Sequence, residues 1–317
     1  MKNTYMINNY KNIANKFCEE GNFIKAINFY NKAYNLEGGS EDIDLLLDMA
    51  LAYDDMGNYD FAYQKYEEVL NIDENEARAY FGLGALYDNK QEYTTSIKHY
   101  EKAVEIDDEY DRAYFFLATA YDEIGNRELA IKNYKKAIEL NQDDFWAYTN
   151  LGSLYEEINE NELAYEMTKE ALGIISNHFT ALFNMAVILK KLGREEEAIK
   201  YYEMSIQRDK ENPYSYLNLS IIYKGEQKYK KACEVISEGI KNSPETSVLY
   251  YNRACFYVKL GMNELALKDL IKAIKLSERL LEYANEDEEL APIREMKAYK
   301  IMFSTQEELA GDRYDTK

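Results

Sequence analysis

Proline, cysteine and long apolar runs are scarce in this sequence. Only three of its 317 residues are proline, and this scarcity favours long helices because proline interrupts them. Its three cysteines, Cys18, Cys233 and Cys255, share no metal-ligand spacing, which argues against a disulfide framework or zinc site and favours a reducing compartment. The sequence has no run of about 18 apolar residues to span a membrane and no apolar segment of a secretory signal. We therefore expect a cytoplasmic protein.

The residue patterns of common enzymes are also missing. The two histidines, His99 and His178, have no cysteine or serine at a catalytic spacing. Gly82 and Gly84 lie within a predicted helix and do not form a phosphate-binding loop. Carboxylates are abundant, but their pattern places them on solvated helix faces. We predict no enzymatic activity, no cofactor and no metal.

Negative charge dominates the sequence. It has 38 Lys and Arg against 58 Asp and Glu, a formal net charge of −20. This sign argues against nucleic acid and against anionic membranes as partners, because both would be repelled. Two interpretations of the excess remain: it favours a basic partner, or it only keeps a helical surface solvated. The frequent Asn, Lys, Ile, Glu and Tyr are typical of an AT-rich bacterial genome.

Similar segments recur every 34 residues. The stretch AYFGLGALYDNKQEYTTSIKHYEKAVEID begins at Ala79, and AYFFLATAYDEIGNRELAIKNYKKAIELN begins at Ala113. When Ala77 is position 1, positions 8 and 20 are always small, position 11 is always large, and position 24 is mostly tyrosine. The period is broken only by a two-residue insertion within 38–42. It defines eight units: 7–42, 43–76, 77–110, 111–144, 145–178, 179–212, 213–246 and 247–280.

Each unit predicts two antiparallel helices. Large residues at positions 4, 7 and 11 share one helical face, and a second apolar stripe follows at positions 20, 24 and 27. Glycine near position 15 can end the first helix in the left-handed conformation. One such hairpin cannot bury both stripes, whereas a stack of hairpins can. The glycines at position 15 are Gly21, Gly57, Gly125, Gly193 and Gly261.

This pattern resembles the tetratricopeptide repeat (TPR) over about residues 7–280. The family motif is an aromatic residue, then L-G-x2-Y, then A-x3-F/Y; serine replaces its alanine at Ser96, and tyrosine usually replaces its tryptophan. The resemblance implies an all-α TPR superhelical solenoid of eight repeats, with the first helix of each repeat lining a concave surface. The motif is matched in the third and fifth units by Tyr80, Leu83, Gly84, Tyr87, Tyr100, Tyr148, Leu151, Gly152, Tyr155 and Ala164.

The sequence after the last repeat predicts a cap. Residues 281–308 are expected to form C-terminal capping helices, and residues 309–317 a flexible tail. Pro292 can occupy the first turn of a new helix. Leu290, Ile293 and Met296 would then form a narrow apolar stripe over the exposed face of the final repeat.

Asparagine occupies position 6 in four consecutive units and again in the first unit, at Asn12. A carboxamide offers donors and acceptors to the backbone of an extended peptide, and such a row resembles the asparagine ladder of some superhelical TPR domains. Alternatively, asparagine is simply common at this TPR position and bonds locally. The four candidate peptide-binding residues are Asn150, Asn184, Asn218 and Asn252.

Large apolar residues accompany the asparagines at position 5, off the predicted packing stripe. If they face an open groove, they form an exposed apolar lining of the kind that marks binding sites; if helix packing covers them, they belong to the core. We favour the binding interpretation. The candidates are Phe183, Leu217 and Tyr251 in the later units and Phe81 and Phe115 in the earlier ones.

The charge at positions 12 and 13 changes sign along the chain. Early units have acids, including Asp88 and Asp122, whereas late units have lysines, including Lys190 and Lys224. Lysine complements the negative C-terminal end of a helix, but acids there oppose it at a cost of a few tenths of a kcal/mol each. The acids therefore indicate a basic partner, or serve solubility alone.

Chaperone-binding TPR domains use a clamp for a C-terminal carboxylate, and it is only partly matched here. Lys11 and Asn15 match its opening pair, and Arg78 could stand for a later lysine. Asp48 and Gly82, however, occupy positions where that clamp has asparagine and arginine. Because Asp48 would repel a carboxylate, we do not expect this clamp.

The sequence thus predicts a non-enzymatic module that binds a peptide or an extended protein segment in a concave TPR groove. The expected ligand has basic character toward the early units and acidic or apolar character toward the later ones. Two alternatives are a receptor for a regulatory signalling peptide and a structural scaffold that assembles through its helix edges.

Overall fold

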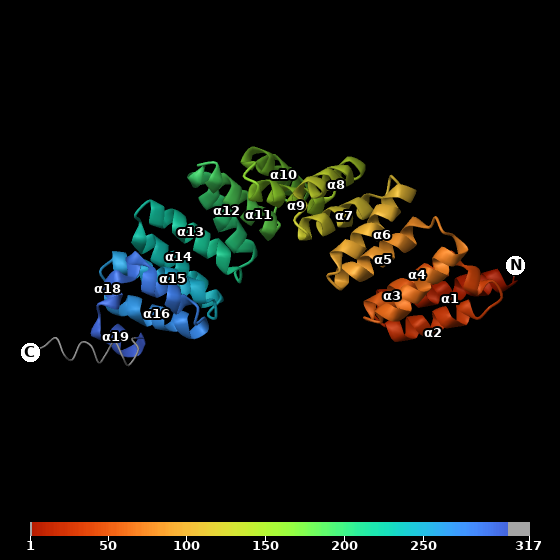
Figure 1. The fold of residues 1–317 in the computed structure, drawn as a ribbon, viewed down its shortest axis with the longest axis horizontal. Helices are drawn as coiled ribbons and strands as arrows, with labels where there is room; N and C mark the ends of the chain where they lie inside the picture. The colour runs from red at the N-terminus through yellow and green to blue at the C-terminus, as the bar shows by residue number, and fades with distance from the viewer. Residues whose placement is uncertain (1, 304–317) are drawn as a thin grey trace, which may run out of the picture. The chain divides into compact units, whose positions relative to one another are not determined.

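Helices make up most of the described chain (Figure 1). The structure is a computed structural model that describes residues 2–303. The first eight helices are α1 Lys2–Glu19, α2 Phe23–Tyr34, α3 Ile43–Asp55, α4 Tyr59–Ile72, α5 Ala77–Asn89, α6 Tyr93–Ile106, α7 Asp111–Glu123 and α8 Arg127–Leu140. The next eight are α9 Phe145–Glu157, α10 Asn161–Ile174, α11 Phe179–Lys191, α12 Glu195–Arg208, α13 Pro213–Gly225, α14 Tyr229–Asn242, α15 Ser247–Lys259 and α16 Asn263–Leu276. The chain continues with α17 Leu280–Glu286, α18 Ala291–Arg294 and α19 Lys297–Phe303, and it has two 3-10 turns, η1 Gly39–Glu41 and η2 Glu288–Leu290.

The helices α1 to α16 form eight successive pairs, followed by shorter helices at the C-terminal end. This confirms the predicted all-α architecture of helical hairpins with a C-terminal cap. By its contacts the chain divides into two larger compact units, each of several repeats. They are residues 1–154 (unit 1) and 155–317 (unit 2), with the division inside α9. In unit 1 each helix from α1 to α8 packs on the next, and in unit 2 the same holds from α10 to α16.

The two helices of a pair are joined by a turn whose residue at position 15 is left-handed. Five of these residues are the predicted glycines, with φ between 70° and 76°. The other three are Gln91, Asn159 and Gln227, at φ 60°, 63° and 58°. The left-handed turn is therefore confirmed, and it also forms where no glycine is present.

Small and aromatic side chains share the space between helices. Every alanine at positions 8 and 20 is fully buried, which lets neighbouring backbones approach closely. At Gly84 an added Cβ would lie 2.5 Å from the ring of Tyr100, so this contact requires glycine. The tyrosines at position 24 are at most 2% exposed in Tyr30, Tyr66, Tyr100, Tyr134 and Tyr202.

The C-terminal helices cover the end of unit 2. Leu290 and Ile293 are fully buried in the same core as α13 to α16, and Met296 packs against that core. Pro292 lies in the first turn of α18, as expected. Arg294 fixes the segment by donating from Nη1 to the carbonyl oxygens of Ala284 (2.8 Å) and Asp287 (2.5 Å).

Two earlier expectations concern residues beyond this region. Residues 304–308 of the expected cap and the expected tail 309–317 lie outside the described part of the chain. Within residues 2–303, no helix combines the length and apolar character needed to cross a membrane.

Candidate functional site

First helices of successive pairs lie side by side in both units. In unit 1, α1 contacts α3, α3 contacts α5, and α5 contacts α7; in unit 2, α13 contacts α15. We call the surface of these helices the first-helix face. It comprises positions 2, 5, 6, 9, 12 and 13 of each repeat, where the candidate residues lie.

A cavity of about 400 Å³ opens on the first-helix face of unit 1. Its apolar lining comes from Leu47 and Leu51 of α3, Phe81 of α5 and the buried ring of Tyr66 beneath them. Leu51 is 54% exposed, a high value for a leucine. The site therefore has an apolar surface that is available to a ligand.

Gly82 lines the cavity, and its missing side chain lets the ring of Tyr66 lie against the backbone of α5. Gly82 occupies position 6, where later repeats have asparagine, and an added Cβ would lie 2.2 Å from Tyr66 Cζ. The Tyr66 ring thus fills the space that a side chain would need. In the sequence, this arrangement is indicated only by a glycine at position 6, where later repeats have asparagine.

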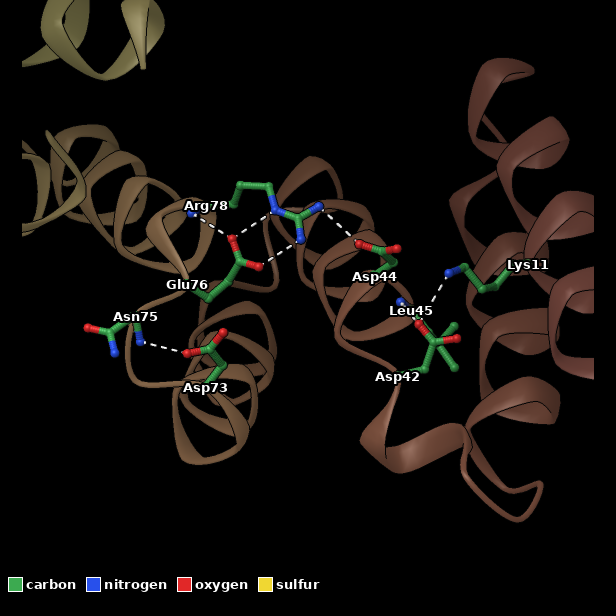
Figure 2. Close-up of polar contacts among 8 residues, drawn as sticks. All are labelled: Lys11, Asp42, Asp44, Leu45, Asp73, Asn75, Glu76 and Arg78. Carbon is green, nitrogen blue, oxygen red and sulfur yellow. Dashed lines mark hydrogen bonds and ion pairs between the residues drawn. The ribbon is translucent and has the colours of Figure 1, made fainter. Parts of the chain in front are cut away.

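Asp44 and Arg78 line the cavity and belong to a set of charged side chains that pair with one another (Figure 2). Glu76 accepts hydrogen bonds from Arg78 Nε at 2.8 Å and Nη2 at 2.7 Å, and Arg78 Nη1 donates to Asp44 at 3.0 Å. The bonds from Arg78 hold the pKa of Glu76 below its usual range. Figure 2 also shows Lys11 of α1 directed at Asp42, at 3.2 Å. These pairs link the middle of α1 to the start of α3, and the start of α3 to the start of α5.

Asp48 is the acid that lies deepest in this site. It is half-buried in α3, and burial raises the pKa of its carboxyl, while Lys11 and Asn15 partly offset the rise. Arg112 covers the other side of the cavity, with its guanidinium 5.4 Å from the centre of the Phe81 ring. The cavity therefore combines an apolar floor with both signs of charge.

A larger cavity in unit 1, of about 690 Å³, lies away from the first-helix face. Its walls come mainly from α6, α7 and α8 and include the ion pair of Lys136 and Glu139 at 3.0 Å. Tyr121 donates a hydrogen bond to Glu101 at 2.5 Å on the same wall. Because long charged side chains line this cavity, we regard the smaller one as the better binding site.

The four candidate asparagines lie on the first-helix face and have contacts within the chain. Asn150 Nδ2 donates to the hydroxyl of Tyr134 at 3.3 Å, and Asn252 Nδ2 donates to the carbonyl oxygen of Val248 at 2.9 Å. Asn184 is also engaged within the chain. Local bonding therefore accounts for part of the pattern, and binding to a peptide backbone stays a prediction.

Asn218 lies beside a buried tyrosine. Burial raises the pKa of Tyr202, and the neighbouring Asn218 amide partly offsets the rise. Tyr202 Oη forms no hydrogen bond within the described residues. Position 6 thus lies next to the position 24 tyrosine of the preceding repeat both here and at the pair of Asn150 and Tyr134.

The apolar candidates are half-buried and not freely exposed. Phe81 packs on Tyr110 at 5.1 Å between ring centres, and Phe115 packs on Tyr134 at 5.9 Å. Phe183 packs on Tyr202 at 5.9 Å, and Leu217 lies against the core of unit 2. Each side chain thus contributes to packing while remaining only half-buried, and binding at position 5 stays a prediction.

The acidic candidates lie at the ends of their first helices. Asp88 accepts a hydrogen bond from Tyr100 at 3.4 Å, and burial raises the pKa of Asp88. Asp122 is half-buried and has a partner within the chain.

The late basic candidates differ in their contacts. Lys190 is half-buried at the end of α11. Lys224 of α13 forms an ion pair at 2.7 Å with Glu289, which belongs to residues 286–289 after the last repeat, here called the C-terminal segment.

Sequence reasoning missed this contact of the C-terminal segment with the first-helix face of unit 2. The hydroxyl of Tyr251 donates to Asp287 at 2.7 Å, and Glu289 lies 3.7 Å from Lys259 as well as next to Lys224. The acids of 286–289 were visible in the sequence, but no local pattern indicated that they fold back onto α13 and α15.

Models of the tetratricopeptide repeat match residues 45–80, 77–110, 120–159, 147–178, 179–212 and 248–279. Residues 199–247 also match a model of anaphase-promoting complex subunit 5. A search of curated proteins found no significant match.

Solved structures of three other proteins have a similar fold. A tetratricopeptide repeat protein from Parabacteroides merdae has a TM-score of 0.57 at 18% identity, over 74% of this chain and 93% of its own. PilF of Pseudomonas aeruginosa has a TM-score of 0.56 at 20% identity, over 68% of this chain and 99% of its own. YrrB is a TPR protein described as having an unusual peptide-binding site. Its TM-score is 0.51 at 22% identity, over 59% of this chain and 95% of its own. The repeat models together cover more than half of the sequence, and the chain therefore belongs to the tetratricopeptide repeat family.

Proposed function

We propose that this protein-interaction module binds an extended segment of a partner protein on the first-helix face of unit 1. The cavity at Gly82 is the observation that carries the proposal. A pocket with an apolar lining and a few fixed polar groups is the usual form of a specific binding site. An apolar side chain of the partner would enter it and lie against Leu47, Leu51 and Tyr66.

The charges around the cavity favour a partner with basic residues beside the apolar anchor. Asp48 lies in the cavity, and Asp88 and Asp122 follow at the other end of α5 and α7. Arg78 adds little repulsion, because Glu76 and Asp44 already neutralise it. Basic residues of the partner would be attracted by this field and by the net charge of −20.

Support also comes from YrrB, which shares the fold and is described as having a peptide-binding site. Asn150, the candidate asparagine of unit 1, donates one N–H to Tyr134, and a carboxamide has a second N–H bond that would pair with the backbone of the bound segment.

The proposal can be tested by selecting random dodecapeptides on phage against the full chain. Leu51→Gln removes apolar surface from the cavity with little effect on folding, since the side chain is 54% exposed. Leu163→Gln on α10 is the matched control, because Leu163 is 44% exposed on a second helix. We expect the selected peptides to lose about tenfold in affinity with Leu51→Gln, and to keep it with Leu163→Gln.

Two results would contradict this function. One is a selection that enriches no peptide above background. The other is an equal loss of affinity in both variants, which would show that peptides do not use the cavity.

A further inference from the structure

The C-terminal segment shows which chemistry the first-helix face of unit 2 accepts. Asp287 and Glu289 alternate along the chain, and both direct their carboxylates at this face. Asp287 accepts a hydrogen bond from Tyr251 at 2.7 Å, and Glu289 lies between Lys224 and Lys259. A short acidic segment is therefore already bound to side chains at positions 5, 12 and 13.

The same positions continue into the preceding repeat. Lys190 occupies position 12 of α11, one repeat before Lys224. Its neighbour Lys191 is held by Glu156 at 2.5 Å, whereas Lys190 itself has no ion pair within residues 2–303. The row of lysines thus extends one repeat beyond the region that the C-terminal segment neutralises.

Apolar side chains lie along the same surface between α11 and α13. They occupy positions 5 and 9 and are half-buried, and all but Ile221 pack against the core of unit 2. These positions correspond to those of Tyr251 and Cys255, which face Asp287 in the last repeat. The side chains are Phe183, Val187, Leu217 and Ile221.

We infer that the first-helix face of α11 and α13 binds an acidic, extended segment of a partner protein, with one carboxylate at Lys190. The segment would resemble residues 287–289 in presenting two carboxylates that are two residues apart, and its apolar residues would lie on Phe183 and Leu217. This rests on the proposed function in one respect only, that first-helix faces bind protein segments. It assigns to unit 2 a ligand of opposite charge to that of unit 1.

The test uses two labelled heptapeptides and the full chain. The first, NEDEELA, has the sequence of residues 285–291; the second, NQNQQLA, replaces each acid by its amide. Fluorescence anisotropy is measured with the unchanged chain, with Lys190→Glu, and with Lys200→Glu as control. Lys200 is an exposed lysine on the second helix α12.

We expect the acidic peptide to bind more tightly than the amide peptide, and its affinity to fall as salt is raised. Reversing the charge at Lys190 is expected to weaken it on the order of tenfold, with little change in Lys200→Glu. Circular dichroism of the variants verifies that the helices are retained.

Three outcomes would overturn the inference: no binding of the acidic peptide, equal binding of both peptides, or equal effects of the two lysine variants. None of them decides the proposed function, which depends on Leu51 and the cavity of unit 1. Conversely, failure of the Leu51→Gln test would leave charge-dependent binding at Lys190 measurable.

Discussion

At the scale of single residues, Asp48 and Asp42 differ in their surroundings although both lie near Lys11. Asp42 Oδ1 forms an ion pair with Lys11 Nζ at 3.2 Å. The same oxygen caps α3 by accepting a hydrogen bond from the backbone N–H of Leu45 at 2.9 Å. Asp48 is half-buried, and burial raises its pKa despite the same lysine. The first acid stabilises the fold, whereas the second is held in place at a cost, as is common at binding sites.

Replacing Asp48 by asparagine is predicted to stabilise the protein at neutral pH. Because its pKa is higher in the folded than in the unfolded chain, folding loses stability as pH rises from the unfolded to the folded pKa. Asp48→Asn removes that loss. We expect a higher urea midpoint than the unchanged chain at pH 7, and the same midpoint at about pH 3, below the ordinary pKa of Asp near 3.9.

Asp143→Asn is the control for this change, because Asp143 is exposed. It should leave the difference between the two pH values unaltered. A lower midpoint of Asp48→Asn at pH 7 would show instead that the carboxylate stabilises the fold.

At the scale of elements, the turn between paired helices recurs with one backbone shape and different residues. Five repeats place glycine in the left-handed position, and three place glutamine or asparagine there. A side chain with a Cβ costs about 1–2 kcal/mol in this conformation, and asparagine tolerates it better than glutamine.

Gln227→Gly is therefore predicted to stabilise the α13–α14 hairpin by about 1 kcal/mol, and Gly193→Ala to destabilise the α11–α12 hairpin by a similar amount. The added Cβ at Gly193 meets no atom within 4 Å, so conformation alone causes the change. Thermal unfolding by circular dichroism measures both. Midpoints that move together in one direction would refute this account.

The repeat period was sufficient to predict the hairpins, because positions 4, 7, 8, 11, 20 and 24 encode packing between neighbours in sequence. The cavity could not be predicted in the same way. It depends on the Tyr66 ring lying under Gly82, and on Leu51 and Arg112 meeting from different repeats. The contacts of Asp287 and Glu289 likewise require the chain after the last repeat to fold back onto α13 and α15, which no periodic pattern encodes.

At the scale of the whole molecule, contacts divide the chain into two compact units, and each unit has buried clusters of its own. In unit 2 one core joins α11 to α19 and contains Ile293 and Tyr299 of the cap. In unit 1 the buried clusters lie around α1 to α3 and around α3 to α5. Repeat proteins transmit stability mainly between neighbours.

Ile293→Ala is predicted to destabilise unit 2 and to leave unit 1 unchanged. The side chain is fully buried, and its truncation should cost about 2–5 kcal/mol. Hydrogen exchange followed by mass spectrometry should show faster exchange in α13 to α16 and unaltered exchange in α1 to α6. Faster exchange throughout the chain would indicate one cooperative unit instead.

The helices after residue 280 have a consequence for assembly. They occupy the place where a ninth hairpin would stack on α15 and α16, with Leu290 and Ile293 inserted as the next repeat would insert its own apolar stripe. Another hairpin could therefore stack on α15 and α16 only if these helices were displaced. Lengthening the array at an internal repeat would leave them in place.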